Sequence, residues 1–419
     1  MKGWNRARLA WMMTLSPHRR QISEVVLRLK AEKDLAGRAS LPTENRQFNR
    51  HKPFDERRLF HTDSLPIEGS RPSKLSPDLR ECIEAIRRQT VAENRNNITR
   101  TNAYIKFFER HPEIHWALLA HCVSRNGGWC MSDTKGEWFS RMASAKQSRA
   151  FFSFLERSNW LIFADAYPQL LLYEESRRRR ENLSFVLPLF GVSRFMEVMW
   201  DLFWETGNSH LLTRALIINE QNHIESRVVR DSDYEATVES SLQFHIDSLL
   251  NLNQVLIPYR MNGKTHMAGT TMRHFHAMHD RIETGLRLYR ILYQHERIHQ
   301  AIVEFMVGIP HTASRADYWP ERFTAVKPIT VAETYQPRFT ENGTADKIYS
   351  PTLEDAWSDV AQEPAEPGDW FRDISWAIYL FTSVPDSPMD ISQDYINKLK
   401  TIERTILLTE KAAKALHAT

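Results

Sequence analysis

Glycine is scarce in this chain, and that scarcity limits the folds open to it. Only 14 of the 419 residues are glycine, about 3% against a usual share of about 7%. Propellers, barrels with many tight turns and phosphate-binding loops depend on glycine, because it adopts left-handed backbone angles without strain. The sequence also contains no Walker motif and no Gly-x-Gly-x-x-Gly. We therefore predict an all-α fold, a multi-helix bundle of long helices joined by short loops.

The first 75 residues carry an excess of positive charge. They hold 16 Lys and Arg against 8 Asp and Glu, whereas the whole chain has a net charge of only +3. Apart from one amphipathic stretch at 21–35, this segment is rich in proline and poor in aliphatic residues, which is typical of a poorly ordered tether. We predict a basic, loop-rich N-terminal arm at 1–75 that is partly disordered. Because such arms attract phosphates, one alternative function is nucleic-acid or anionic-membrane surface binding through this arm.

Capping residues and apolar periodicity divide the rest of the chain into three parts. Ser76-Pro77 opens a run of helical patterns that extends to residue 311. Within that run, Asn262-Gly263 predicts the turn of a small hairpin. The following stretch is rich in proline, threonine and aromatic residues. We predict a helical core domain at 76–311, a C-terminal loop or linker strap at 312–373, and C-terminal helices packed on the core at 374–419.

Helix breakers predict the ends of several core helices. Gly127-Gly128 should stop the helix that begins after Pro112, and Pro168 should interrupt the apolar stretch around it. A long helix is expected at 234–255, before Pro258.

Cysteine usage and hydropathy bear on the compartment. Cys82, Cys122 and Cys130 are an odd number at irregular spacing, so no disulfide framework is indicated. No window of about 18 apolar residues is present, so we expect no transmembrane segment. A cytoplasmic location is the expectation.

Polar residues gather in an unusual cluster between residues 111 and 136. His111 and His115 are four apart, which on one helix is a spacing that can hold a metal ion, although a helix cap and a surface histidine are the commoner explanation, because a zinc site needs three or four ligands. Glu220 continues a helix that should be buried, so it needs a partner, and Arg100 or Arg125 could supply it. We predict that these residues form a buried network or a small-ligand pocket. The candidate binding residues are Arg100, His111, Glu113, His115, Arg125, Asn126, Asn219 and Glu220.

A metal-dependent enzyme is a second reading. Two Glu-x-x-His pairs, Glu220 with His223 and Glu296 with His299, match the pattern of di-metal carboxylate bundles. About one such pair is expected by chance from this composition. No cofactor is otherwise expected, and whether the chain is an enzyme stays open. The alternative ligands for a divalent metal are His111, His115, Glu220, His223, Glu296 and His299.

Long runs of this sequence resemble the YppC-like proteins of Bacillus-type bacteria, an uncharacterised family classed as a domain of unknown function. The resemblance covers about residues 79–357. It implies a cytoplasmic bacterial helical protein and brings no activity, ligand or partner. The runs that carry it include Asn97-Ile98-Thr99-Arg100-Thr101, Val123-Ser124-Arg125-Asn126-Gly127-Gly128-Trp129, Ile217-Ile218-Asn219-Glu220-Gln221, Ser314-Arg315-Ala316-Asp317-Tyr318-Trp319-Pro320 and Ser350-Pro351-Thr352-Leu353-Glu354-Asp355-Ala356-Trp357.

Overall fold

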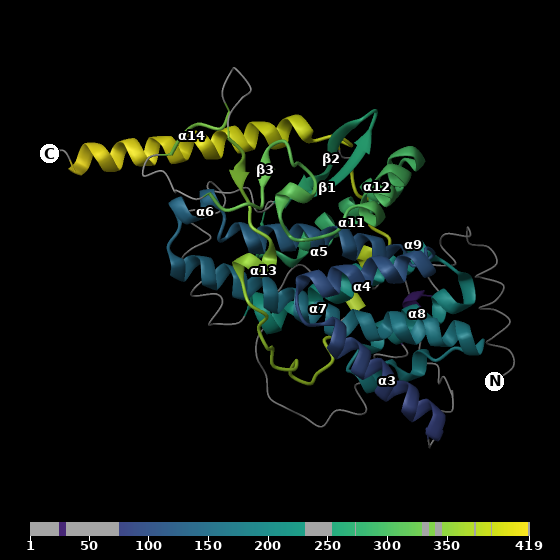
Figure 1. Ribbon diagram of the computed structural model, residues 1–419. Coiled ribbons are helices and arrows are strands. Elements are labelled where there is room, and N and C mark those ends of the chain that lie inside the picture. The colour runs from purple at the N-terminus through teal and green to yellow at the C-terminus, as the bar shows by residue number, and fades with distance from the viewer. Residues whose placement is uncertain are drawn as a thin grey trace, which may run out of the picture. The chain divides into compact units, whose positions relative to one another are not determined.

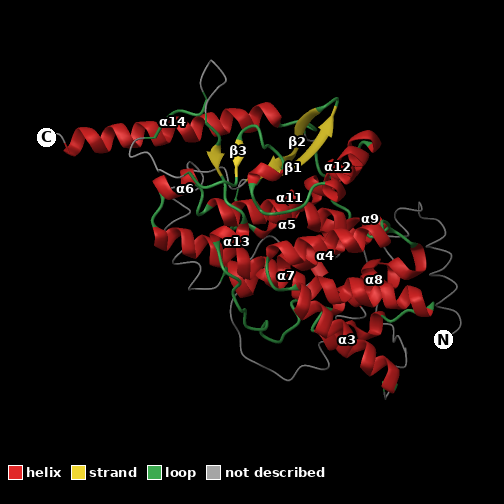
Figure 2. Ribbon diagram, viewed as in Figure 1, coloured by secondary structure: helices red, strands yellow, loops and turns green. Residues whose placement is uncertain are grey.

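The protein is mostly helical, as its composition predicts. In the computed structural model, helices dominate the described part of the chain, where the strands form two sheets of two strands each (Figure 1, Figure 2). None of the described helices is both long and apolar enough to cross a membrane. The structure describes residues 25–30, 75–230, 254–272, 274–328, 335–339, 346–372, 374–386 and 388–417. Most of the predicted N-terminal arm, and residues 234–253 of the predicted long helix, lie outside these ranges.

The chain forms two compact units, each built from three segments far apart in the sequence. Unit 1 contains Met1–Ile86, Pro168–Asn219 and Pro367–Ser383, and unit 2 contains the remaining segments. The predicted domain division at residues 76, 312 and 374 stays a prediction. The chain passes between the units within three helices: α3 (Pro77–Glu93), α7 (Ala145–Arg179) and α9 (Ser209–Ile224).

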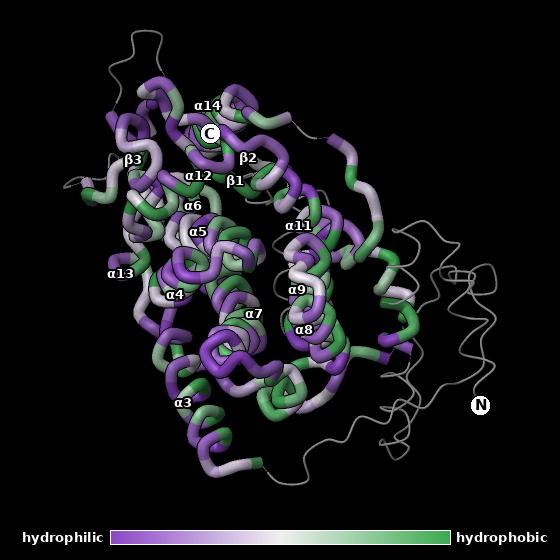
Figure 3. Tube along the Cα trace, turned by 90° about the vertical axis from the view of Figure 1, so that its right-hand side faces the viewer, coloured by the Kyte–Doolittle hydropathy of each residue, from purple (hydrophilic) through white to green (hydrophobic). Residues whose placement is uncertain are grey.

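Unit 1 follows the predicted caps closely. Helix α8 (Arg194–Thr206) begins at its N-cap Ser193 and ends at Gly207, which adopts a left-handed φ of 64°. Asn208 Oδ1 then accepts from the backbone N–H of Leu211 at 2.9 Å and caps α9. Hydrophobic and hydrophilic residues alternate along the helices in Figure 3. The described part of unit 1 also contains the helical residues 25–30, within the amphipathic stretch predicted at 21–35, and two 3-10 helices, Ser184–Phe190 and Ile374–Leu380.

Helix α5 (His115–Asp133) is the centre of unit 2. Nearly all of its residues are buried, so it is surrounded by neighbours rather than exposed on one side. It contacts α4, α6, α11, α13 and the first hairpin strand. The other α-helices that lie wholly within unit 2 are α4 (Asn97–Arg110), α6 (Glu137–Met142), α11 (Met278–Tyr293), α12 (Glu296–Gly308), α13 (Leu353–Ala356) and α14 (Ser392–His417).

The predicted hairpin is present. Strands β1 (Gln254–Met261) and β2 (Lys264–Thr271) pair antiparallel around Asn262 and Gly263, whose φ angles of 52° and 72° are those that this tight turn requires. Because β1 starts at Gln254, the helix predicted for 234–255 is wrong at its last two residues. A second pair, β3 (Phe323–Thr324) and β4 (Ile348–Tyr349), is parallel.

Two predicted helix breaks are wrong. Helix α5 continues through Gly127-Gly128. A Cβ at Gly128 would lie 2.3 Å from Asn97 Oδ1 and 2.7 Å from His311 Nε2, so glycine is needed there for close packing and not to end the helix. Helix α7 likewise runs through Pro168. An interior proline costs about 3 kcal/mol, and burial of the flanking Tyr167 and Leu170 offsets that cost.

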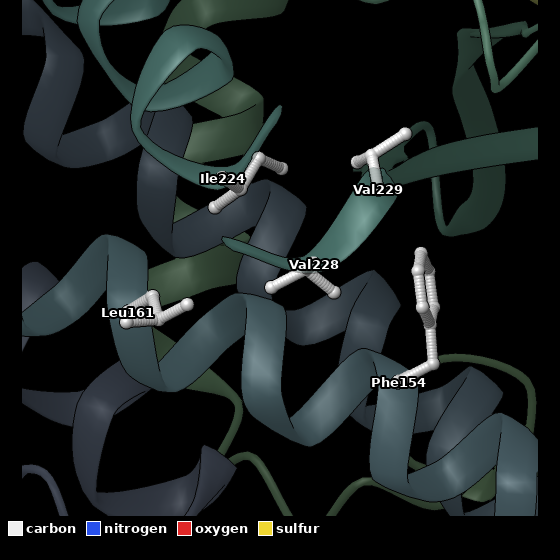
Figure 4. Close-up of a cluster of buried hydrophobic side chains, with 5 residues drawn as sticks. All are labelled: Phe154, Leu161, Ile224, Val228 and Val229. Carbon is white, nitrogen blue, oxygen red and sulfur yellow. The ribbon is translucent and has the colours of Figure 1, made fainter. Parts of the chain in front are cut away.

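A hydrophobic cluster fixes α7 against the chain that follows α9. Phe154 and Leu161 lie seven residues apart on α7 and therefore share a face. They pack against Ile224, Val228 and Val229, the last two from the π-helical turn Glu225–Val229 (Figure 4). This packing places the end of α9 next to α7.

Candidate functional site

Arg100 forms a buried ion pair between α4 and α7. Its Nη2 lies 2.5 Å from Glu156 Oε2, and both side chains are almost inaccessible. Its Nη1 also donates to Asn94 Oδ1 at 3.2 Å. Burial raises the pKa of Glu156, and the neighbouring Arg100 opposes that rise. The charge of Arg100 is therefore compensated within the fold.

His111 and His115 do not lie on one helix. His111 is the C-cap of α4, whereas α5 begins at His115, with Ile114 between them in a non-helical conformation. The predicted metal-binding spacing is therefore not realised. His111 Nδ1 lies 3.5 Å from Glu113 Oε1. His115 instead hydrogen-bonds through Nδ1 to the hydroxyl of Tyr289 at 2.8 Å.

Arg125 and Asn126 connect α5 to its neighbours. Nη1 and Nη2 of Arg125 donate to the carbonyls of Ile309 at 2.8 Å and Pro310 at 3.0 Å, just beyond the end of α12. Burial lowers the pKa of Arg125 to about 10. Asn126 Oδ1 accepts from the backbone N–H of Leu256 on β1 at 3.1 Å. Both side chains thus satisfy backbone groups that would otherwise lack a partner.

Glu220 does not pair with Arg100 or Arg125, contrary to the prediction, because both guanidinium groups are engaged elsewhere. The partly buried carboxylate accepts from the indole N–H of Trp116 at 3.2 Å and from the side-chain amide of Gln221 at 3.2 Å. The predicted contact between α5 and α9 is therefore present, but it is made by the neutral indole N–H of Trp116 and not by an arginine. Burial raises the pKa of Glu220 to about 7, and Asp165 adds to the rise.

Asn219, the residue before Glu220, belongs to unit 1. Its Oδ1 accepts from the indole N–H of Trp370 at 2.8 Å. This bond ties α9 to the segment that follows residue 366 within the same unit.

The six alternative metal ligands are not brought together. Among the described residues, no three of them place ligand atoms within 4.8 Å of one another, the spacing at which His279, Asp280 and Glu283 do gather. His223 Nδ1 lies 3.6 Å from Asp165 Oδ1, and burial lowers the pKa of His223 to about 3. On α12, Glu296 Oε1 accepts from Gln300, and His299 Nδ1 lies 3.0 Å from the carbonyl of Leu292.

A small cavity of about 40 Å³ lies elsewhere in unit 2, and we call it the Arg315 pocket. It forms where the end of α5, the start of β1, the 3-10 helix Arg315–Asp317, the end of β4 and helix α14 meet. Its polar lining residues are Asp133, Glu137, Gln254, Arg315, Ser350, Tyr395 and Lys398.

Arg315 is held in place by three hydrogen bonds. Its Nε donates to Asp133, and its Nη1 donates to the hydroxyls of Tyr318 at 2.8 Å and Tyr395 at 2.9 Å. Asp133 is fixed in turn by the hydroxyl of Ser350 at 2.8 Å. Burial opposes the charge of Arg315, but Asp133 and the tyrosines raise its pKa well above its ordinary value, so the guanidinium stays charged.

Three polar groups at this pocket have no hydrogen-bond partner in the described part of the chain. Nη2 of Arg315 makes no hydrogen bond to any described residue. Tyr318 and Tyr395 share one hydroxyl proton at 2.8 Å, which leaves one of their two O–H donors unused. Burial raises the pKa of both tyrosines, so both stay protonated. The Oε1 of Gln254, a side chain only 3% exposed, has no donor among the described residues.

The pocket residues were missed because they come from segments with no shared pattern. Arg315 lies in the stretch predicted as a loop strap, and Gln254 at the end of a predicted helix. A signal was present in the runs around Arg315 and Ser350, which carry the family resemblance, and Tyr395 has the spacing of an inward-facing position on α14. The spacing of these residues along the sequence does not indicate that they lie together in the fold.

Comparisons with known proteins agree with the resemblance. Residues 92–393 match the family model described as a protein of unknown function, DUF2515. The chain is also 41% identical over 239 residues to an uncharacterised protein, YppC of Bacillus subtilis (strain 168), a match that covers 57% of this chain and 73% of that protein. No solved structure matches the chain.

Proposed function

Since this chain belongs to the DUF2515 family of proteins of unknown function, we propose its function from the geometry of its own residues: it binds a small molecule, and the Arg315 pocket is the binding site. The observation that carries this proposal is the unpaired Oε1 of Gln254. A buried acceptor without a donor costs about 1–3 kcal/mol. That cost is recovered when a ligand supplies the missing hydrogen.

The position of Gln254 distinguishes it from other unpaired groups. Buried polar atoms without a partner also occur on Arg100, His121 and Arg125, but of all such side chains among the described residues Gln254 alone lines the cavity. Arg315 lines the same cavity, and its Nη2 makes no hydrogen bond to a described residue. A site with both a donor and an acceptor unused is arranged for a polar guest.

We assign the residues predicted from the sequence a different role. Arg100, Arg125 and Asn126 serve the fold, a role supported by their partners Glu156, the carbonyls beyond α12 and the N–H of Leu256. We also propose a cytoplasmic location, supported by the free thiols of the three cysteines.

A thermal-shift screen tests the binding function. Wild-type protein is heated with amides, amino acids, hydroxy acids and small carboxylates, and each hit is measured again on Gln254→Met, which keeps the length of the side chain and removes the acceptor. We expect a hit whose stabilisation largely disappears in that variant. Gln169→Met is the matched control, because Gln169 is also buried but accepts from the indole N–H of Trp200 at 2.8 Å and is not among the residues that line the pocket. It should retain the response to the ligand. A wild-type protein that no compound stabilises, or a hit that stabilises Gln254→Met equally, would contradict the proposal.

A further inference from the structure

We infer that the Arg315 pocket recognises a primary carboxamide, the –CO–NH2 group of a small neutral molecule. This inference rests on the proposed binding function and names its ligand class. It follows from three features of the pocket: the donors it leaves unused, the acceptor it leaves unused, and the balance of charge and volume around them.

The unused donors call for an acceptor oxygen. Nη1 and Nε of Arg315 are occupied by Tyr318, Tyr395 and Asp133, so only Nη2 can reach a guest. Tyr395 lines the cavity and Tyr318 does not. If Tyr318 donates to Tyr395, the remaining O–H belongs to the residue that faces the guest. One carbonyl oxygen has two lone pairs and can accept from both donors.

The unused acceptor calls for an N–H or O–H on the same guest. Gln254 is oriented by its own amide, whose Nε2 donates to Asp394 Oδ2 at 3.2 Å, which leaves Oε1 as the group without a partner. A carboxylate ligand would bring only acceptors and would leave Oε1 unpaired. A carboxamide brings an acceptor and a donor on adjacent atoms.

The charge and the volume of the cavity agree with a neutral carboxamide group. Arg315 and Lys398 face Asp133 and Glu137 around the cavity, so the formal charges of the lining cancel. A charged guest would therefore lack a counter-charge in a partly buried space. A cavity of about 40 Å³ holds roughly three water-sized groups. The oxygen, carbon and nitrogen of a carboxamide fill that space, and the rest of the molecule would lie at the mouth.

Four small probes of similar size separate the possibilities. Acetamide offers both an acceptor and a donor, acetone only the acceptor, acetate two acceptors and a charge, and ethylene glycol hydroxyls alone. Their dissociation constants are measured by ligand-observed NMR titration on the wild-type protein and on Gln254→Met. We expect acetamide to bind about tenfold more tightly than acetone or acetate, because neither of these supplies a hydrogen to Gln254 Oε1. Ethylene glycol supplies both a donor and an acceptor but loses the rotational freedom of its bonds on binding, so it should also bind more weakly than the rigid acetamide. In Gln254→Met, acetamide should weaken to the level of acetone, and acetone should be unchanged.

The outcomes separate failure of the ligand class from failure of the site. If acetate, acetone or ethylene glycol binds as tightly as acetamide and weakens in Arg315→Lys, the carboxamide inference is overturned and the binding function stands. If no probe binds, the cavity holds water only and both proposals fail. Both also fail if acetamide binds Gln254→Met and wild type equally, because the ligand then lies elsewhere.

Discussion

Replacing Glu220 with glutamine tests whether this carboxyl group is held in the protein without a cationic partner. Glutamine has the shape of the protonated acid and keeps an oxygen that accepts from Trp116. Burial raises the pKa of Glu220 from 4.5 to about 7. The folded protein therefore holds this proton to a higher pH than the unfolded chain does. Protonation stabilises the fold fully below about pH 4.5, and that contribution is lost as the pH rises towards 7.

The size of the effect follows from the same values. A rise of roughly 2.5 pH units at about 1.4 kcal/mol each corresponds to at most about 3.5 kcal/mol. Glutamine carries no charge at any pH, so Glu220→Gln should match wild type near pH 4.5 and exceed its free energy of unfolding by up to about 3.5 kcal/mol at pH 8. Trp116→Phe should enlarge the pH dependence of the wild-type side chain, since it removes a donor that stabilises the carboxylate.

Urea unfolding at the two pH values measures this difference directly. A loss of stability in Glu220→Gln that is equally large at both pH values would refute the reasoning, because it would mean that the pKa of Glu220 is the same in the folded and the unfolded protein. An arginine partner, as predicted from the sequence, would produce the opposite pH dependence, with the variant weaker at pH 8.

Three further expectations can be checked by thermal or chemical unfolding. Gly128→Ala should destabilise the protein by about 3 kcal/mol, because its Cβ would break the buried hydrogen bond between His311 and Asn97; Gly308→Ala, where nothing lies within 4 Å, should be neutral or slightly stabilising, and equal effects at both glycines would count against the close-packing explanation. In the absence of ligand, Gln254→Met removes an unpaired acceptor but also the hydrogen bond from Nε2 to Asp394, so it should change the free energy of unfolding by less than about 1 kcal/mol, whereas Gln169→Met should lower it by about 1–3 kcal/mol; a loss in Gln254→Met as large as that in Gln169→Met would show that its oxygen already has a structural partner. Arg100→Met alone should cost about 3–5 kcal/mol, and the double variant with Glu156→Leu should recover most of that loss; a double variant no more stable than the single one would argue against the ion pair as the cause.

Local signals predicted the helices well where a cap decides their ends. Ser193, Gly207 and Asn208 stand at the positions predicted for them, and the hairpin turn at Asn262-Gly263 forms because both residues tolerate positive φ. These features depend on a few neighbouring residues, so short-range chemistry is sufficient to predict them.

Predictions failed where contacts with a distant segment decide the structural role of a residue. Gly128 resembles a helix end until His311 and Asn97 are seen to occupy the space of its missing side chain. Pro168 resembles a break until the burial on both sides of it is known. The candidate site fails for the same reason, since Asp133, Gln254, Arg315 and Tyr395 come from four separate segments and none carries a periodic pattern that indicates the others.

The position of α5 at the centre of unit 2 has a consequence during synthesis. The partners of its polar side chains arrive late, since Asn126 awaits a strand residue 130 positions downstream and Arg125 a carbonyl 184 positions downstream. At about 5–20 residues per second, a ribosome needs roughly 10–40 s to deliver those partners. During that interval the apolar residues of α5 and the guanidinium of Arg125 lack the segments that bury them in the folded protein. This stretch of the nascent chain is therefore open to association with other chains until synthesis delivers those segments.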